Sequence, residues 1–133
     1  MDIIGNRGIV SFAPENSFVT LKFVKSLKLN WIKTDVILTK DNVPVIFHDK
    51  KLNRLTNYNG EIKNFNYNEL KTVDIGYKYS LNFIGERIPL LSEFIKKCDN
   101  LSINIFLELK NYYNNELELV ENVIKIITNY KNI

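Results

Sequence analysis

The sequence contains few of the features that build cross-linked or membrane-spanning proteins. It has one cysteine, Cys98, so no disulfide can form within the chain, which fits a reducing compartment. No apolar run approaches the ~18 residues that a membrane-spanning helix needs, so a transmembrane protein is not expected. The opening residues, MDIIGNRG, show neither a basic leader nor the apolar stretch of a signal peptide, so the expected location is the cytoplasm. Cys98 itself is expected to be a buried helix residue rather than a reactive thiol.

An excess of charge of one sign is also lacking. The 18 basic and 15 acidic residues give a net charge of +3, and the lysines are scattered along the chain. The sequence therefore lacks the basic block or stripe that is typical of nucleic-acid-binding proteins. With 45% hydrophobic and 25% charged residues, the chain has the composition of one globular domain, expected to span residues 1–133.

The apolar periodicity predicts strands that alternate with helices. The expected strands lie at Ile3–Ile4, Trp31–Thr39, Val43–Phe47 and Leu101–Leu109. The expected helices lie at Ser17–Lys28, Tyr67–Lys71, Leu90–Cys98 and Glu116–Tyr130. This alternation favours parallel βαβ units in an α/β fold. The polar connection from Asp49 to Gly85 is longer than ordinary loops, so it should either fold locally or carry function.

Charged or phosphate-compatible side chains gather near the end of each predicted strand. They are Asn6 and Arg7 after the first strand, Lys33 and Asp35 in the second, His48 and Asp49 after the third, and Glu108 and Lys110 at the last. Residues two apart in a strand point to the same face of the sheet. Function collects at the carboxyl ends of parallel strands, so we expect these side chains to form one site.

Several sequence blocks, in this order, resemble the glycerophosphodiester phosphodiesterase family. They are NRG, APEN, KTDVILTKDNVPVIFHD, LTNYNGEIKNFNYNEL, DIG, ERIPLLSEF and FLELK, which run from about Ile3 to Lys110. The resemblance implies a TIM barrel, of which this chain would hold about the first four β/α units. It also implies an enzyme of lipid metabolism that cleaves glycerophosphodiesters into sn-glycerol 3-phosphate and an alcohol, using a divalent cation.

The resemblance further implies a role for each matching residue. His48 matches a catalytic histidine, and Arg7 and Lys110 match the arginine and lysine that contact phosphate. Asp35 and Glu108 match two carboxylates that hold the cation, Mg²⁺ or Ca²⁺. The residues expected to support the site are Glu15, Asn16 and Asp49.

Two positions depart from the family pattern. Asn6 replaces a catalytic histidine and cannot transfer a proton near pH 7, a loss that typically costs ~10²–10⁴ in rate. Lys33 replaces a metal-binding glutamate. An ammonium ~4 Å from a dication repels it by ~8 kcal/mol at an effective dielectric constant of ~20. We therefore expect weak or absent cation binding, with Lys33 paired instead to Asp35 and Glu108.

A complete barrel takes ~250 residues, so this chain has room for about half of one. An open half-barrel exposes two strand edges, and three outcomes are open. Two copies could pair as a homodimer, a separate chain could supply the complementary half, or the chain could be a decayed product that folds poorly.

Three functions are consistent with these residues. The first is a phosphodiesterase with an impaired site. The second is a non-catalytic module that binds phosphate or phosphodiesters through Arg7, Lys33 and Lys110, and the third is a remnant without activity. Sphingomyelinase D toxins share part of this site, but they resemble secreted, disulfide-bearing proteins, unlike this sequence.

Overall fold

The computed structural model describes residues 3–130. Its strands are β1 (Ile4–Asn6), β2 (Trp31–Leu38), β3 (Pro44–Ile46) and β4 (Asn104–Leu109). Its α-helices are α1 (Thr20–Ser26), α2 (Tyr67–Leu70), α3 (Leu91–Asn100) and α4 (Glu116–Ile127). Two 3₁₀ helices, η1 (Ile62–Asn64) and η2 (Leu81–Phe83), lie between β3 and α3. Every element expected from the periodicity is present, with ends that shift by a few residues.

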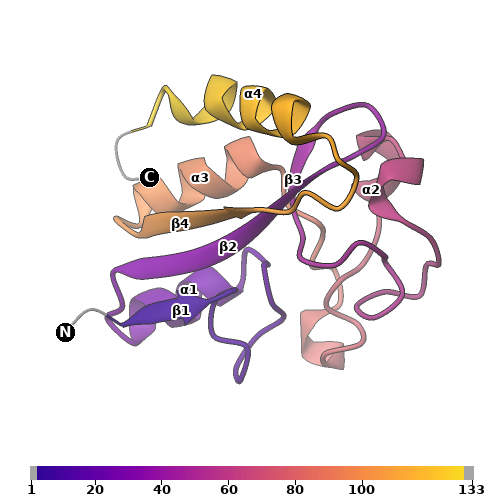
Figure 1. Cartoon of the computed structure of the whole chain (residues 1–133). Coiled ribbons are helices and arrows are strands. Elements are labelled where there is room, and N and C mark those ends of the chain that lie inside the picture. The colour runs from indigo at the N-terminus through magenta and orange to yellow at the C-terminus, as the bar shows by residue number, and fades with distance from the viewer. Residues whose placement is uncertain (1–2, 131–133) are drawn as a thin grey trace.

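Strand β2 is the centre of the sheet (Figure 1). It pairs in parallel with β1 and β4 and antiparallel with β3. The carbonyl oxygen of Lys33 accepts a hydrogen bond from Arg7 N (2.7 Å), and that of Asp35 accepts one from Phe47 N (3.0 Å). Because carbonyl groups two apart in a strand point to the same edge, β1 and β3 share one edge of β2. Strand β4 occupies the other edge.

The expectation of about four parallel β/α units is wrong for the third strand. Only a short turn joins β2 to β3, closed by a hydrogen bond from Thr39 N to Val43 O at 3.1 Å. A parallel pair needs a crossover of a dozen or more residues, so this turn forces β3 to run antiparallel. Among residues 3–130 the parallel strands are β1, β2 and β4, which make three β/α units.

The main core lies between the sheet and helices α1, α3 and α4. Its buried residues include Leu21, Val24, Ile32, Val36, Phe94, Ile95, Cys98, Ile105, Leu119 and Val123. Cys98 is buried in α3, as expected, and this burial raises the pKa of its thiol to about 12. Because apolar residues of β2 face this core, the alternate residues of the strand, which include the site residues, lie on its opposite face.

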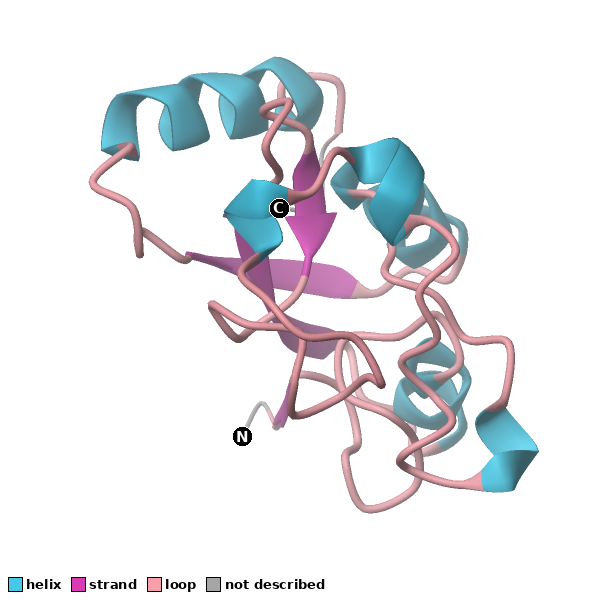
Figure 2. Ribbon diagram, turned by 90° about the vertical axis from the view of Figure 1, so that its right-hand side faces the viewer, coloured by secondary structure: helices cyan, strands magenta, loops and turns pink. Residues whose placement is uncertain are grey.

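A second core shows that the long connection after β3 folds locally, as expected. Its buried residues are Ile37, Val45, Phe47, Leu52, Ile62, Leu70, Val73, Ile75 and Ile88. Figure 2, viewed from the side on which this connection lies, shows its loops and short helices gathered beside the sheet. The connection thus forms a compact subdomain that can hold side chains rigidly against the strand ends.

The face of the sheet turned away from the main core is covered by the second core near Ile37 and is open beside β1 and β4. Ile4 and Phe106 are 48% and 58% exposed there. Together with Asn6 and Lys33 they line a hollow of about 250 Å³. None of the helices within residues 3–130 is both long enough and apolar enough to cross a bilayer.

Candidate functional site

The turn after β1 brings Arg7 to the carboxyl end of the sheet. Arg7 adopts a left-handed backbone conformation (φ 57°) and is followed by Gly8 with φ 94°. Its amide donates to Lys33 O, and its carbonyl accepts a hydrogen bond from Asn16 N at 2.9 Å. A left-handed arginine is unfavourable, so the surrounding contacts must hold this turn in place.

A side chain at Gly8 would clash with its neighbours, whereas a side chain at Gly85, another glycine with positive φ, would not. A Cβ at Gly8 would lie 2.1 Å from Thr20 Oγ1, whereas a Cβ at Gly85, with φ 102°, would meet nothing within 4 Å. Gly85→Ala should lower the free energy of unfolding by ~1–2 kcal/mol for its backbone conformation alone. Gly8→Ala should lose a further ~1–3 kcal/mol because α1 must move. Urea unfolding of both variants measures the difference, and equal losses would contradict this account.

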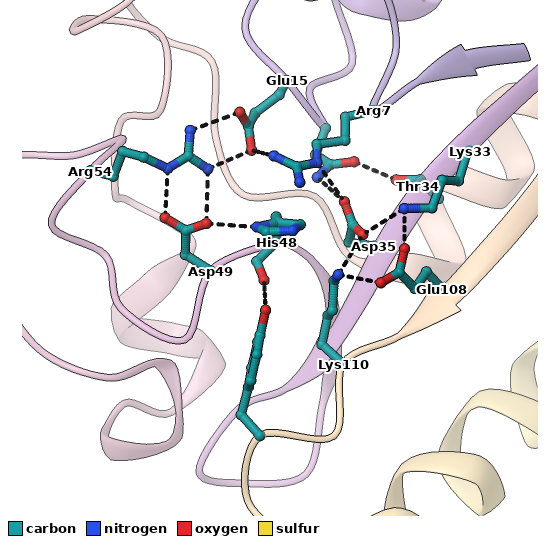
Figure 3. A network of polar contacts seen from close by, with 12 residues as sticks. Arg7, Glu15, Lys33, Thr34, Asp35, His48, Asp49, Arg54, Glu108 and Lys110 are labelled. Carbon is teal, nitrogen blue, oxygen red and sulfur yellow. Dashed lines mark hydrogen bonds and ion pairs between the residues drawn. The ribbon is translucent and has the colours of Figure 1, made fainter.

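Two ammonium groups and two carboxylates alternate where the middle of β2 lies beside the carboxyl end of β4 (Figure 3). Asp35 and Glu108 are register partners in the parallel pair. Lys33 Nζ lies 3.5 Å and Lys110 Nζ 3.3 Å from Asp35 Oδ1. Both ammonium groups also contact Glu108. The hydrogen bonds from Lys110 and Lys33 lower the pKa of Glu108 to about 2, so this carboxylate stays ionised at neutral pH.

Asp35 is the most enclosed member of the cluster, with its side chain fully buried. Besides the two lysines it faces Arg7, whose Nε lies 3.4 Å from Oδ2. The Asn16 side-chain amide donates to the same oxygen at 3.0 Å and accepts from Thr34 Oγ1 at 2.7 Å. Asn16 is itself left-handed (φ 53°), a conformation that asparagine tolerates better than most residues.

His48 belongs to a second chain of contacts. Its Nδ1 lies 2.7 Å from Asp49 Oδ1, and its backbone carbonyl accepts a hydrogen bond from the Tyr112 hydroxyl at 2.9 Å. Arg54 donates to both oxygens of Asp49, at 2.6 and 2.9 Å, and to both oxygens of Glu15, at 2.9 and 2.8 Å. The hydrogen bonds from Arg54 hold the pKa of Asp49 at about 2, so Asp49 presents a fixed negative charge to the His48 ring.

Arg7 joins the two groups of contacts. Its Nη1 lies 3.4 Å from Glu15 Oε1, while its Nε faces Asp35. Figure 3 shows the resulting network from Arg54 through Glu15 and Arg7 to the lysine cluster. The residues that the sequence selected and that meet here are Arg7, Glu15, Asn16, Lys33, Asp35, His48, Asp49, Glu108 and Lys110.

Asn6 stands apart from that network, since its side chain lines the neighbouring hollow with Lys33. Sequence reasoning missed Arg54, Thr34 and Tyr112. Arg54 lies in the long connection that was expected to fold locally or carry function. Nothing in the local sequence distinguished it from the other basic residues there.

A divalent cation does not fit the residues that the resemblance assigned to it. Asp35 and Glu108 have the right donor chemistry, because hard cations prefer carboxylate oxygens. However, Lys33 and Lys110 each pair with both carboxylates, so two ammonium groups already neutralise their two negative charges. Within residues 3–130 no group of three or more His, Cys, Asp or Glu side chains is arranged to hold a metal ion.

Comparison with known proteins places this chain in a family. The family model for the glycerophosphoryl diester phosphodiesterases matches residues 7–132. A glycerophosphodiester phosphodiesterase of Caldanaerobacter subterraneus is 34% identical over 96% of this chain and 53% of its own length. One from Bacillus altitudinis is 36% identical over 82% of this chain and 45% of its own length.

Solved structures agree in fold. An Oleispira antarctica phosphodiesterase in complex with its product sn-glycerol 3-phosphate superposes with a TM-score of 0.92 at 32% identity, covering 96% of this chain and 52% of that one. A glycerophosphodiester phosphodiesterase from Agrobacterium tumefaciens gives 0.82 at 25% identity, covering 96% and 55%. Both neighbours are TIM-barrel enzymes, and the present chain spans about half the length of the relatives it matches. The chain belongs to the glycerophosphoryl diester phosphodiesterase family.

Proposed function

We propose that this chain binds the phosphate group of a glycerophosphodiester or of sn-glycerol 3-phosphate through its own cations, without a metal ion, and that its hydrolytic step is impaired. One observation carries the proposal. Lys33 pairs with both Asp35 and Glu108, at the place where the family resemblance implies a cation. The positive charge that a phosphate needs is therefore built into the chain.

Donor capacity supports phosphate binding. Each ammonium has three N–H donors and a guanidinium has five, more than the neighbouring carboxylates engage. The side chains of Arg7 and Lys33 are 25% and 26% exposed, so an anion can reach them from solvent. The buried Nε of Arg7 makes no hydrogen bond within the described residues, although it lies 3.4 Å from Asp35 Oδ2. The product complex of the Oleispira antarctica relative supports sn-glycerol 3-phosphate as the ligand to test.

A slow phosphodiesterase is the second candidate, and the His48 contacts favour it. With Nδ1 turned to Asp49 at 2.7 Å, the other ring nitrogen is free to exchange a proton with a reacting oxygen. Hydrolysis needs one proton taken from the attacking water and one given to the leaving alcohol. Asn6 can do neither, so His48 would have to serve both steps in turn. We expect turnover at least ~10²-fold below that of a site with two histidines.

Titration calorimetry with sn-glycerol 3-phosphate tests metal-free binding. The chain should bind this ligand equally well in EDTA and in Mg²⁺ or Ca²⁺. Lys33→Gln should weaken binding ~10- to 150-fold, since a charged hydrogen bond is worth ~1.5–3 kcal/mol. Lys71→Gln, which removes an exposed lysine of the connection, is the matched control and should change little. Binding that requires the divalent ion would contradict the proposal.

A glycerophosphocholine hydrolysis assay separates the two candidates, because slow but measurable turnover would favour the phosphodiesterase and no turnover would favour binding alone. Turnover at rates ordinary for the full-length relatives would show that Asn6 and Lys33 do not impair the site.

A further inference from the structure

Arg54 bridges two loops at the edge of the site. Its Nε and Nη2 donate to the two oxygens of Asp49 at 2.6 and 2.9 Å. Its Nη1 and Nη2 donate to the two oxygens of Glu15 at 2.9 and 2.8 Å. Paired hydrogen bonds of this kind fix the orientation of both partners as well as their distance. Glu15 belongs to the loop after β1 and Asp49 to the loop after β3, so Arg54 connects the two loops (Figure 3).

The backbone around Arg54 is anchored on both sides. Leu52 is buried in the second core, and its carbonyl accepts hydrogen bonds from the amide and the hydroxyl of Thr56 at 3.1 and 2.9 Å. The carbonyl of Asn53 accepts a hydrogen bond from Lys78 Nζ at 2.7 Å. The guanidinium of Arg54 therefore extends from a fixed support toward its two carboxylates.

His48 is held at two points, one in its backbone and one in its ring. The Tyr112 hydroxyl donates to its carbonyl at 2.9 Å, and ring Nδ1 lies 2.7 Å from Asp49 Oδ1. The hydrogen bonds from Arg54 hold the pKa of Asp49 at about 2, so at neutral pH this carboxylate only accepts hydrogen bonds. A neutral ring must therefore carry its hydrogen on Nδ1 and keep the lone pair on Nε2.

We propose that Arg54 is a positioning residue, which holds Asp49 in the orientation that selects the Nδ1–H tautomer of His48. Glu15 is the second anchor that keeps the guanidinium in place. A ring in this tautomer can accept a proton at Nε2, and the positive charge it gains then faces the Asp49 carboxylate. The role in hydrolysis rests on the proposed function, because it matters only if the site takes a phosphodiester.

The tautomer can be measured without ambiguity, because His48 is the only histidine of the chain. In NMR spectra of the chain labelled with ¹⁵N-histidine, at a pH where the ring is neutral, the protonated and unprotonated nitrogens have well-separated shifts. The Nδ1–H form should exceed the Nε2–H form at least ~10-fold, since a hydrogen bond to a charged acceptor favours it. An unrestrained neutral histidine favours Nε2–H instead. An unchanged chain in which Nε2–H dominates would overturn the proposal.

Three variants separate positioning from a general effect on the fold. Arg54→Gln should lower the ratio of the two tautomers at least ~5-fold, because Asp49 then loses its paired donors and can turn to solvent. Arg54→Lys keeps the charge but not the planar pair of donors, so its ratio should be intermediate. Arg87→Gln is the matched control. It breaks an ion pair of the same connection, in which Arg87 Nη1 lies 2.8 Å from Asp74 Oδ2, and should leave the ratio unchanged.

The outcomes are distinct. An unchanged ratio in folded Arg54→Gln would overturn the proposal, and so would an equal fall in Arg87→Gln. Circular dichroism checks the fold. If Arg54→Gln does not fold, Arg54→Lys decides, and a ratio equal to that of the unchanged chain would overturn the proposal. The spectra are recorded without ligand, so a failure of sn-glycerol 3-phosphate to bind would contradict the proposed function alone.

Discussion

The Lys33→Glu variant should bind Mg²⁺ or Ca²⁺ at least ~100-fold more tightly than the unchanged chain. The substitution removes an ammonium that contacts Glu108 and lies 3.5 Å from Asp35, and it adds a third carboxylate beside them. At ~4 Å and an effective dielectric constant of ~20, loss of the ammonium alone relieves ~8 kcal/mol of repulsion on a dication, an order-of-magnitude value. Titration calorimetry measures the affinity.

Two further variants separate the causes of this gain. Lys33→Gln removes the repulsion without adding a ligand, so its affinity should lie between those of the other two chains. Lys71→Glu makes the same change of charge at an exposed position of the connection and should leave cation affinity unchanged. Sub-millimolar binding by the unchanged chain that Asp35→Ala removes would show that Lys33 does not exclude the ion.

The double variant Asn6→His with Lys33→Glu tests whether these two residues or the missing barrel strands limit catalysis. Glycerophosphocholine hydrolysis that rises with the double variant would assign the impairment to these two residues. A double variant that binds the cation but remains inactive would assign it to the missing barrel strands instead.

Asp35→Ala should cause the largest loss of stability of any single substitution in the site, about 3–5 kcal/mol. The Asp35 carboxylate is fully buried and faces Lys33, Lys110 and Arg7 at 3.3–3.5 Å. Its removal leaves three cations close together without their shared partner and takes an acceptor from Asn16. Urea unfolding followed by circular dichroism measures the change.

Glu108→Ala is the matched control, because it removes a carboxylate that contacts the same two lysines. The Glu108 side chain is 39% exposed, so solvent screens the charges left behind. Exposed ion pairs contribute ~0–1 kcal/mol, and this variant should lose no more than that. Equal losses for the two variants would mean that burial does not set the strength of the Asp35 contacts.

The close approach of the site side chains on β2 and β4 could be predicted, because side chains alternate between the two faces of a strand with a period of two residues. Lys33 and Asp35 had to share a face of β2, and Glu108 had to lie beside Asp35 once β4 paired in parallel register. The antiparallel direction of β3 was also encoded in the sequence, since Lys40–Asn42 is far too short for a crossover, but the alternation of strands and helices concealed it.

The position of Arg54 could not be predicted in the same way. It depends on how the connection folds around its own core, and contacts between residues 39 positions apart leave no local pattern. Tyr112 is a similar case, because its hydroxyl reaches the backbone of a residue 64 positions away. The sequence therefore predicts the half of the site that lies on strands better than the half that the connection supports.

The central place of β2 has a consequence for how such a protein can diverge. Ile32 and Val36 are fully buried against the helices, whereas the Lys33 side chain is turned to the open face and keeps 26% of its surface exposed. An exchange of charge at position 33 therefore leaves the packing of the sheet untouched. Substitutions on this face of the strand can therefore change the reactivity of the site in the course of evolution while the fold is conserved.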